Sequence, residues 1–225
     1  MPKNHLKRIS VPRTWLIERK RNTWITRPNC GAHSLSQGTS VNTLLKEMLE
    51  FAKTSRDVKN IVYKKTVLVD GKKIDDFRFN VGLMDVIEFP DIKESYRIII
   101  NKQNKLVAIK NTHSEKPCKI VGKKKIGKLF QLNLFDGKNI LTDNNDYKVN
   151  DTIVITLPDN KIKSHLPFKT DMLGYLTGGN HVGEVGNIEH IDRENVRLKT
   201  ENETFETKKE YVFVIGKDKP AINLT

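Results

Sequence analysis

The hydrophobic pattern is clearest between residues 41 and 52, where apolar side chains recur every three or four positions. The apolar positions are Val41, Leu44, Leu45, Met48, Leu49 and Ala52. In a helix these side chains share one face, and the polar residues between them face water. The pattern therefore predicts an amphipathic helix over residues 41–52.

A second helix is predicted to begin near Thr54. Thr54 and Asp57 have the spacing of a capping box, in which each side chain bonds the other residue's backbone N–H. Val58, Ile61 and Val62 then supply the next apolar face. The other side of this helix is basic.

A β-hairpin follows the second helix. Residues 67–73 read Val-Leu-Val-Asp-Gly-Lys-Lys, which predicts a strand, a two-residue turn and a returning strand. The stretch at 82–89 predicts a further strand. Residues 37–92 are therefore expected to form a small module of two helices and a hairpin.

Short apolar runs separated by turn residues predict a β-rich domain after residue 92. The runs cover residues 97–100, 106–109, 119–121, 129–134 and 152–157. Runs of this length and spacing favour a small barrel-like domain. Residues 122–128 read Gly-Lys-Lys-Lys-Ile-Gly-Lys, and we expect a loop that holds four lysines between glycines. The overall fold class is α+β, mostly β.

The composition is that of a globular protein with an excess of positive charge. Hydrophobic residues make up 37% of the 225 residues, and the net charge is +13 with a pI near 9.6. Each cation that neutralises a phosphate releases a condensed counterion, so nucleic acid is a favoured partner. A membrane partner is not expected, because no basic amphipathic helix or lipidation motif occurs. No apolar run suits a transmembrane helix or a signal peptide, so cytoplasmic residence is the expectation.

Positive charge is concentrated in two parts of the chain. Residues 1–28 carry eight basic side chains and one acidic one, and residues 91–170 carry sixteen and eight. Residues 29–90 hold nine basic and eight acidic side chains, and residues 171–225 hold seven and ten. The first segment also contains Trp15 and Trp24, which favours an extended arm that orders on RNA. A solvated tail, or tryptophans that pack on the protein's own core, are the alternatives.

We predict that RNA binds mainly through cations, because a phosphate backbone demands charge rather than base geometry. The predicted RNA-binding residues are His5, Lys7, Arg8, Arg13, Trp15, Arg19, Lys20 and Arg21 in the arm, Arg56, Lys59, Lys64, Lys65, Lys72 and Lys73 in the helical module, and Lys123, Lys124, Lys125 and Lys128 in the glycine-flanked loop. For the helical module the alternative is a charged face that simply meets water, and for the glycine-flanked loop it is a β-turn whose lysines face water.

The patterns that mark enzymes and metal sites do not occur in the sequence. The six histidines are scattered, and Cys30 and Cys118 lie far apart without a CxxC partner. GxSxG, HExxH, GxGxxG and P-loop spacings are absent. Asp75 and Asp76 are neighbours in a predicted extended segment and would point to opposite faces. We therefore predict no catalytic residues, no cofactor, no metal ion and no small-molecule substrate.

Residues 41–89 resemble the alpha-L RNA-binding module, in which two helices lead into a hairpin. Flanking motifs extend the resemblance over nearly the whole chain. They are His5-Leu6-Lys7-Arg8, Pro12 and Trp15, Gly82-x-Met84-Asp85-Val86-Ile87, Val149-Asn150-Asp151-Thr152-Ile153, Thr177-Gly178-Gly179-Asn180 and Val212-Phe213-Val214-Ile215-Gly216-Lys217. In this order they resemble the S-four-e family of archaeal and eukaryotic small-subunit ribosomal proteins.

The last segment resembles a KOW motif of an SH3-like β-barrel. The resemblance lies in the glycine-rich stretch 178–188 and the alternating Val196, Leu198 and Phe205. Glu184 stands where that family commonly has a basic residue. This departure leaves three roles open for the loop: RNA binding through backbone amides, contact with a neighbouring protein, or completion of the fold.

The resemblance implies four parts and a ribosomal role. The parts are a basic extended arm (1–36), an alpha-L module (37–92), a central β domain (93–170) and a KOW domain (171–225). The implied protein is a structural constituent of the small ribosomal subunit, and its expected partners are small-subunit rRNA and neighbouring ribosomal proteins in the cytoplasm. An RNA-modifying enzyme and a KOW transcription factor that contacts polymerase are the alternatives.

Overall fold

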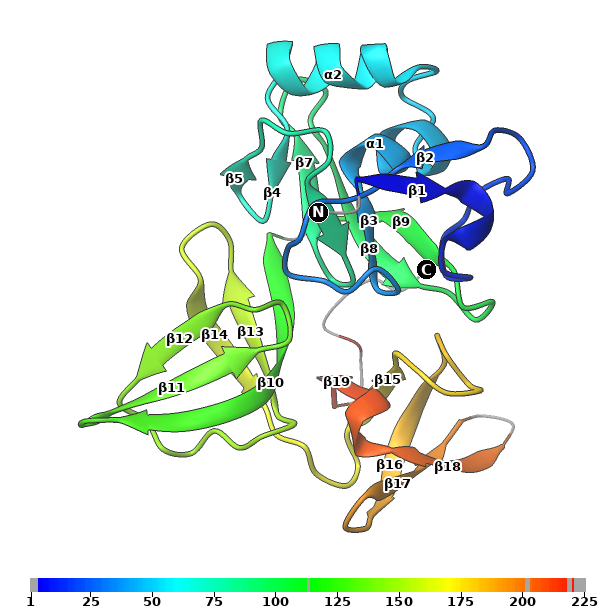
Figure 1. Ribbon diagram of the computed structural model, residues 1–225. Helices are drawn as coiled ribbons and strands as arrows, with labels where there is room; N and C mark the ends of the chain where they lie inside the picture. The colour runs from blue at the N-terminus through cyan, green and yellow to red at the C-terminus, as the bar shows by residue number, and fades with distance from the viewer. Residues whose placement is uncertain (1–3, 113, 201–202, 218–219, 221–225) are drawn as a thin grey trace. The chain divides into compact units, whose positions relative to one another are not determined.

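The protein, seen here as a computed structural model, is described over residues 4–112, 114–200, 203–217 and 220. The chain divides into two compact units. Unit 1 comprises Met1–Ile100 and Asn104–Thr112, and unit 2 comprises Asn101–Gln103 and His113–Thr225. Strands dominate both units (Figure 1). The prediction of an α+β, mostly β fold is confirmed.

Unit 1 is built on antiparallel pairing. A short hairpin joins β1 (His5–Lys7) to β2 (Trp24–Thr26), and a second pair joins β3 (Gly38–Ser40) to β6 (Asn80–Gly82). The main sheet has the order β5-β4-β7-β8-β9. Its strands are β4 (Leu68–Val69), β5 (Lys72–Lys73), β7 (Val86–Phe89), β8 (Glu94–Ile100) and β9 (Leu106–Lys110).

The first helix is shorter than the sequence predicts. It begins as α1 (Val41–Thr43), continues as one π-helical stretch η2 (Leu44–Met48), and ends at Leu49. Glu50 then takes a φ of 54°, a left-handed conformation that a continuing helix does not allow. The expected helix to residue 52 is therefore wrong in its last turn, although Ala52 is buried as its apolar character predicts.

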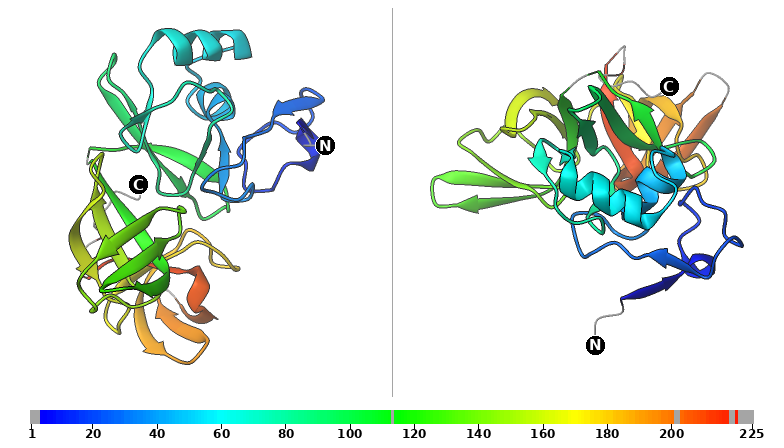
Figure 2. Two further views of the ribbon diagram at one scale, coloured as in Figure 1. Left: turned by 60° about the vertical axis from the view of Figure 1, so that its left-hand side comes forward. Right: turned by 90° about the horizontal axis from the view of Figure 1, so that it is seen from above.

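The second helix and the hairpin are confirmed. In α2 (Ser55–Lys64), Thr54 and Asp57 form the predicted capping box. Val58 and Val62 are fully buried, so the apolar face packs inward while α2 lies on the outside of unit 1 (Figures 1 and 2). Asp70 and Gly71 take φ values of 50° and 74° between β4 and β5. Two positive φ values are what a type I′ hairpin turn requires.

The core of unit 1 includes a residue from the predicted arm. Trp15 is fully buried, together with Leu44, Val58, Val86 and Leu106. Its indole Nε1 donates hydrogen bonds to the carbonyl oxygens of Leu35 (2.9 Å) and Gly38 (3.1 Å). The N-terminal segment is thus anchored by a buried aromatic side chain, and the expectation of an extended arm is corrected at this point.

Two strands join a different sheet from the one that sequence order suggests. The runs at 97–100 and 106–109 do form strands, but β8 pairs with β7 and β9 pairs with β8, so both extend the main sheet of unit 1. Their place in the sequence predicts instead that they belong to the central domain that begins at residue 93. Both pairings join neighbouring strands of the chain, with Phe89 opposite Glu94 and Ile100 opposite Leu106, so two consecutive hairpins continue the sheet past residue 93.

Unit 2 contains two five-stranded antiparallel sheets. The first has the order β12-β11-β10-β13-β14, with β10 (Glu115–Ile126), β11 (Leu129–Leu134), β12 (Asn139–Thr142), β13 (Thr152–Thr156) and β14 (Lys161–Leu166). Cys118, Ile120, Leu132 and Ile153 form its fully buried core. A bulge between Ile120 and Gly122 divides the long strand β10.

The second sheet of unit 2 has the order β18-β17-β16-β15-β19. Its strands are β15 (Leu173–Leu176), β16 (Val185–Ile191), β17 (Asn195–Lys199), β18 (Thr204–Lys208) and β19 (Val212–Gly216). Val196 and Leu198 are fully buried, as the alternating pattern predicts, and they pack with Ile188, Val212 and Val214. A single turn of 3-10 helix, η3 (Lys209–Tyr211), leads into β19.

Candidate nucleic-acid interface

The β1–β2 hairpin presents an exposed aromatic ring among cations. Trp24 is 57% exposed. The His5 ring lies 5.5 Å from the Trp24 ring, and Lys7 Nζ lies 5.9 Å from its centre. An exposed indole beside cations is a surface on which a nucleic-acid base can stack. His5 and Lys7 are among the predicted RNA-binding residues, whereas the aromatic residue predicted with them is Trp15 rather than Trp24.

Three of the predicted RNA-binding residues have structural roles instead. Trp15 is buried, so its ring is not available to a base. Arg8 is 2% exposed, and its Nη1 lies 3.0 Å from Glu47 Oε1. The Arg19 guanidinium donates to the carbonyl oxygens of three residues, Ile9, Val11 and Pro12. In each case the surrounding fold uses the polar group that we had assigned to RNA.

Three further cations of the segment that were predicted to bind RNA face solvent. Arg13, Lys20 and Arg21 are exposed, and Arg21 lies 3.9 Å from Glu18 in an exposed pair. Such an exposed pair contributes little stability. These three side chains are therefore free to meet phosphates.

The outer face of α2 carries the basic side chains that the sequence predicts. Arg56, Lys59 and Lys64 are exposed, as is Lys65 directly after the helix. Within the described residues none of the four has a carboxylate in salt-bridge range. A hydrogen bond from Thr54 lowers the pKa of Asp57, whose carboxylate also accepts from the Thr54 N–H and so completes the cap.

Further cations of unit 1 lie beside Phe77, next to α2, and on the edge strand β5. Lys59 Nζ lies 4.8 Å from the centre of the Phe77 ring, and the Arg78 guanidinium carbon lies 5.7 Å from it. On the edge strand β5, Lys72 and Lys73 are both exposed. An edge strand with lysines resists pairing with another chain, and the same charges are available to a polyanion.

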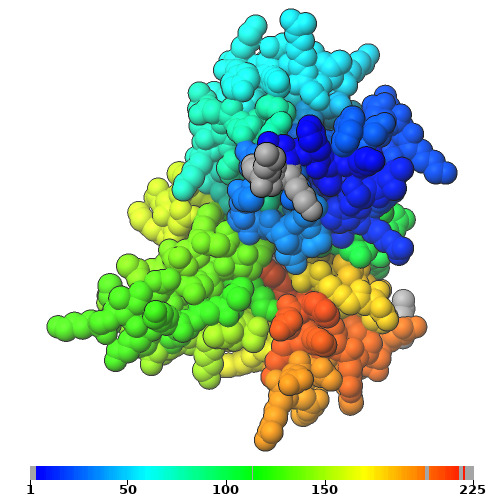
Figure 3. Space-filling view, viewed as in Figure 1, coloured from blue at the N-terminus to red at the C-terminus, as the bar shows by residue number. Residues whose placement is uncertain are grey.

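The four lysines predicted in a loop instead lie on a hairpin. Residues 122–126 belong to β10, and Gly127 with Lys128 forms the turn into β11. Gly127 has a φ of 60° at the first central position of this two-residue turn, where glycine is preferred. In Figure 3 the end of this hairpin, in green, projects as a narrow finger from its own sheet. The glycines serve the turn and the pairing, so the loop interpretation was wrong.

One lysine of this hairpin differs from the other three. Lys123 Nζ donates to Asn145 O (2.8 Å), Asn145 Oδ1 (2.7 Å) and Tyr147 O (2.9 Å), and it lies 4.7 Å from the Phe130 ring centre. Its three donors are all used inside the fold. Lys124, Lys125 and Lys128 are exposed and remain available to phosphates.

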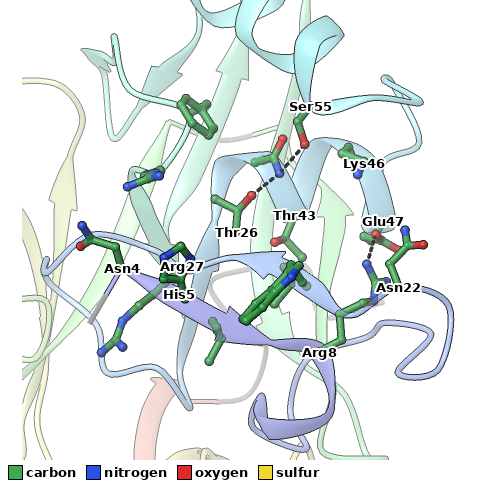
Figure 4. A pocket seen from close by; sticks show the side chains of 16 residues that line it. Asn4, His5, Arg8, Asn22, Thr26, Arg27, Thr43, Lys46, Glu47 and Ser55 are labelled. Atoms are coloured by element: carbon green, nitrogen blue, oxygen red, sulfur yellow. Dashed lines mark hydrogen bonds and ion pairs between the residues drawn. The ribbon is translucent and has the colours of Figure 1, made fainter. Parts of the chain in front are cut away.

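Sequence reasoning missed a pocket in unit 1. It has a volume of about 290 Å³ and lies between the β1–β2 hairpin, the α1–η2 helix and the start of α2 (Figure 4). Trp24, Arg27, Lys46, Phe77 and Arg78 contribute to its wall. Trp24 was visible in the sequence as an aromatic residue within a basic segment. The pairing of β1 with β2, which brings it to the helices, was not.

In the acidic segment 171–225, carboxylates lie close to several basic side chains. Glu184 Oε2 lies 3.5 Å from His181 Nδ1, and the His181 ring stacks on Phe205 at 4.0 Å. On the exposed face of this sheet, Arg197 pairs with Glu206 and Lys199 with Glu189. Several basic groups of this sheet therefore already have acidic partners.

Within the described ranges, no group of three or more His, Cys, Asp or Glu side chains is arranged to hold a metal ion. Among the same residues no helix is long and apolar enough to cross a membrane.

The fold and the distribution of cations define a mostly β protein of two compact units with exposed basic surfaces. Comparison with known proteins identifies the family. Residues 92–162 match the model of Ribosomal family S4e, and residues 1–36 match the RS4NT (NUC023) domain. The small ribosomal subunit protein eS4 of Methanocella arvoryzae is 39% identical over 97% of both chains. That of Methanococcus aeolicus is 38% identical over 99% of this chain and 98% of its own.

A solved structure agrees with these sequence relatives. The crystal structure of the 30S ribosomal protein S4e from Thermoplasma acidophilum has a TM-score of 0.72 and 31% sequence identity, and the match covers 84% of this chain and 99% of that one. The chain belongs to the eS4 family of small ribosomal subunit proteins. This confirms the resemblance found in the sequence motifs.

Proposed function

We propose that this protein is a structural constituent of the small subunit of the cytoplasmic ribosome, where it binds rRNA and supports subunit assembly and translation. The observation that carries the proposal is a near full-length relationship to eS4 proteins, together with exposed cations on α2 that have no acidic partner in the described part of the chain. The partners are small-subunit rRNA and neighbouring ribosomal proteins.

In this proposal each of the four predicted parts supplies a surface that contacts either RNA or a neighbouring protein. They are the basic N-terminal segment (1–36), an alpha-L module (37–92), the central β domain (93–170) and a KOW-type SH3-like barrel (171–225). The capped helix α2 and the β4–β5 hairpin support the alpha-L assignment. The five-stranded sheet of β15 to β19 supports the barrel assignment. One amendment follows from strand pairing, because β8 and β9 extend the sheet of the second part.

Binding in this proposal is electrostatic docking onto folded RNA. The amino groups of Lys64, Lys65 and Lys72 meet backbone phosphates, which fixes position without reading sequence. Lys124 and Lys125 do the same at the β10–β11 hairpin, and the Trp24 ring supplies a stacking surface. The loop around Glu184 contacts a neighbouring protein or completes its own barrel, because its carboxylate opposes phosphate binding.

The two alternatives have no support among these relatives. An RNA-modifying enzyme or a KOW transcription factor would be expected to resemble such proteins over its length, whereas the matches are to ribosomal proteins.

Sedimentation of a cell lysate tests the proposed function. A tagged copy of the full chain is expected to travel with small subunits in a sucrose gradient at low salt. Raised salt should release it progressively, since salt competes with phosphate contacts. A chain that stays at the top of the gradient at low salt, in cells with intact subunits, would contradict the proposal.

A further inference from the structure

The pocket in unit 1 has the size of a small-ligand site. Its volume of about 290 Å³ lies at the lower end of the range for such pockets, so it suits a single small moiety rather than a helix or a peptide strand. In Figure 4 Asn4, His5 and Arg27 lie at one end of the pocket, and Arg8, Asn22 and Glu47 lie at the other. Lys46 and Ser55 approach it from the helical side.

The wall of the pocket combines positive charge with aromatic rings. Arg27, Lys46 and Arg78 contribute cations, and His5 contributes an imidazole ring. Glu47 is the acidic residue of the lining, and its carboxylate is already paired with Arg8 at 3.0 Å. Trp24 and Phe77 also line the pocket, and Trp24 is 57% exposed. A ligand with both an anionic group and a flat ring matches this wall.

Two buried polar atoms of the lining have hydrogen-bonding capacity to spare. Asn42 is 3% exposed, and its Nδ2 donates to Thr26 Oγ1 (2.6 Å) and Ser55 Oγ (3.3 Å). These bonds fix the amide, while Asn42 Oδ1 has no partner among the described residues. Arg8 Nη2 likewise has none, although Nη1 and Nε are bonded to Glu47 and to the Glu18 carbonyl. One buried acceptor and one buried donor are therefore left over beside the pocket, an arrangement that costs free energy unless both are satisfied.

We propose that this pocket receives a single unpaired nucleotide extruded from RNA, a role that rests on the proposed function and specifies how one part of the interface works. The base stacks on the Trp24 ring, and its polar edge reaches Asn42 Oδ1 and Arg8 Nη2 after a small adjustment of the side chains around them. The phosphate of the same nucleotide meets Arg27, Lys46 or Arg78. An acidic peptide matches the charge but would leave the exposed indole without a stacking partner.

A bulged RNA duplex tests this proposal on the full chain. Three probes are compared: a short duplex with one unpaired nucleotide, made with each of the four bases, the same duplex with an abasic residue in the bulge, and the fully paired duplex. At least one bulged duplex is expected to bind about five- to a hundredfold more tightly than the abasic one, the range expected for one stacked base. Trp24 emission should change on binding, whereas buried Trp15 provides a constant background.

Matched variants assign the effect to the pocket. Trp24→Ala should abolish the preference for the bulge, and Trp24→Phe should retain most of it. Lys46→Ala should weaken binding of the bulged duplex more than Lys53→Ala, because Lys46 lines the pocket and the exposed Lys53 is not part of its lining. Each variant is first shown to unfold at the same urea concentration as the native chain.

Three outcomes would overturn the proposal, and they are distinguishable from failure of the proposed function. Equal affinity for all three kinds of probe, with strong salt dependence, would refute the pocket and leave rRNA binding intact. Displacement of the bulged duplex by a poly-glutamate peptide, with the same change in Trp24 emission, would replace the nucleotide by an acidic peptide. Absence of any RNA binding, together with absence from small subunits in the gradient, would refute both.

Discussion

Lys119 lies against the start of strand β19, and its Nζ donates a 2.8 Å hydrogen bond to the carbonyl oxygen of Val212. The same amine donates to the carbonyl oxygens of Lys209 and Glu210, each at 2.9 Å. Lys119 is 7% exposed. One buried ammonium group therefore satisfies three backbone acceptors at the turn η3. In the sequence this residue is indistinguishable from the surface lysines around it.

The buried position of Lys119 predicts a pH dependence. Burial lowers its pKa from 10.5 to about 8, and the charge of Glu210 offsets part of this effect. Between these two pH values the unfolded chain keeps the proton that the folded chain has lost. The free energy of unfolding should therefore rise across this window, by at most about 3 kcal/mol at 1.36 kcal/mol per pKa unit. Urea denaturation followed by circular dichroism, repeated at several pH values across this window, measures the free energy of unfolding.

Lys119→Met is the control for this dependence. The variant loses the titrating amine, so its stability should lack the rise between pH 8 and 10.5 that the native chain shows. Parallel pH profiles for the two proteins would show that the lowered pKa of Lys119 is not linked to folding.

In the β10–β11 hairpin we expect three lysines to bind RNA and a fourth, Lys123, to stabilise the fold. Replacing Lys124, Lys125 and Lys128 with Ala should reduce the slope of log affinity against log salt by about 0.7 to 0.9 for each lost phosphate contact. Lys123→Ala should leave that slope unchanged and lower stability, because its amine bonds Asn145 and Tyr147. Filter binding to small-subunit rRNA over a salt series gives the slope. A fall for Lys123→Ala as large as for Lys124→Ala would contradict this division.

The N-terminal segment should prove to be part of the core of unit 1. Trp15→Ala is expected to cost about 3 to 5 kcal/mol of stability, since it leaves a cavity and two unbonded carbonyl oxygens. Trp24→Ala, at the exposed ring, should change stability by about 0.5 kcal/mol or less. Thermal unfolding of both variants makes the comparison. Equal melting temperatures for the two variants would indicate that the segment is an independent arm and not part of the core.

The capping box of α2 should contribute to stability and to the orientation of the basic face. Thr54→Ala removes the acceptor of the Asp57 N–H and the hydrogen bond to the Asp57 carboxylate, and it should cost about 1 kcal/mol. Thr54→Ser keeps both hydrogen bonds and should cost much less. Urea denaturation of the two variants tests the cap, and indistinguishable midpoints would exclude a stabilising role for it.

Local features of this fold were predictable, and non-local ones were not. The cap of α2 and the Asp70–Gly71 turn are encoded by neighbouring residues, so the sequence predicts them correctly. The burial of Trp15 and the pairing of β1 with β2 depend on residues distant in sequence. A tryptophan in a basic segment looks the same whether it faces RNA or the core.

In the candidate interface, too, the local features were predictable and the non-local ones were not. Lys64 and Lys65 were placed correctly on an exposed surface, because the apolar periodicity of α2 defines which side faces water. Lys123 and Arg8 were assigned to RNA because the sequence does not reveal the acceptors that they meet in the fold. The overall family relationship came from many weak motifs in order, which together extend over most of the chain.

If the exposed cations of unit 1 bind rRNA phosphates, a matched pair of charge variants should differ in the salt dependence of RNA binding. One variant replaces Lys64, Lys65, Lys72 and Lys73 with Gln; its control replaces the same number of cations from the acidic segment, Arg193, Lys199, Lys208 and Lys217. The salt dependence of affinity for small-subunit rRNA should fall by about 3 in log–log slope for the first variant and stay unchanged for the control. Equal slopes for the first variant and the native chain would contradict the claim.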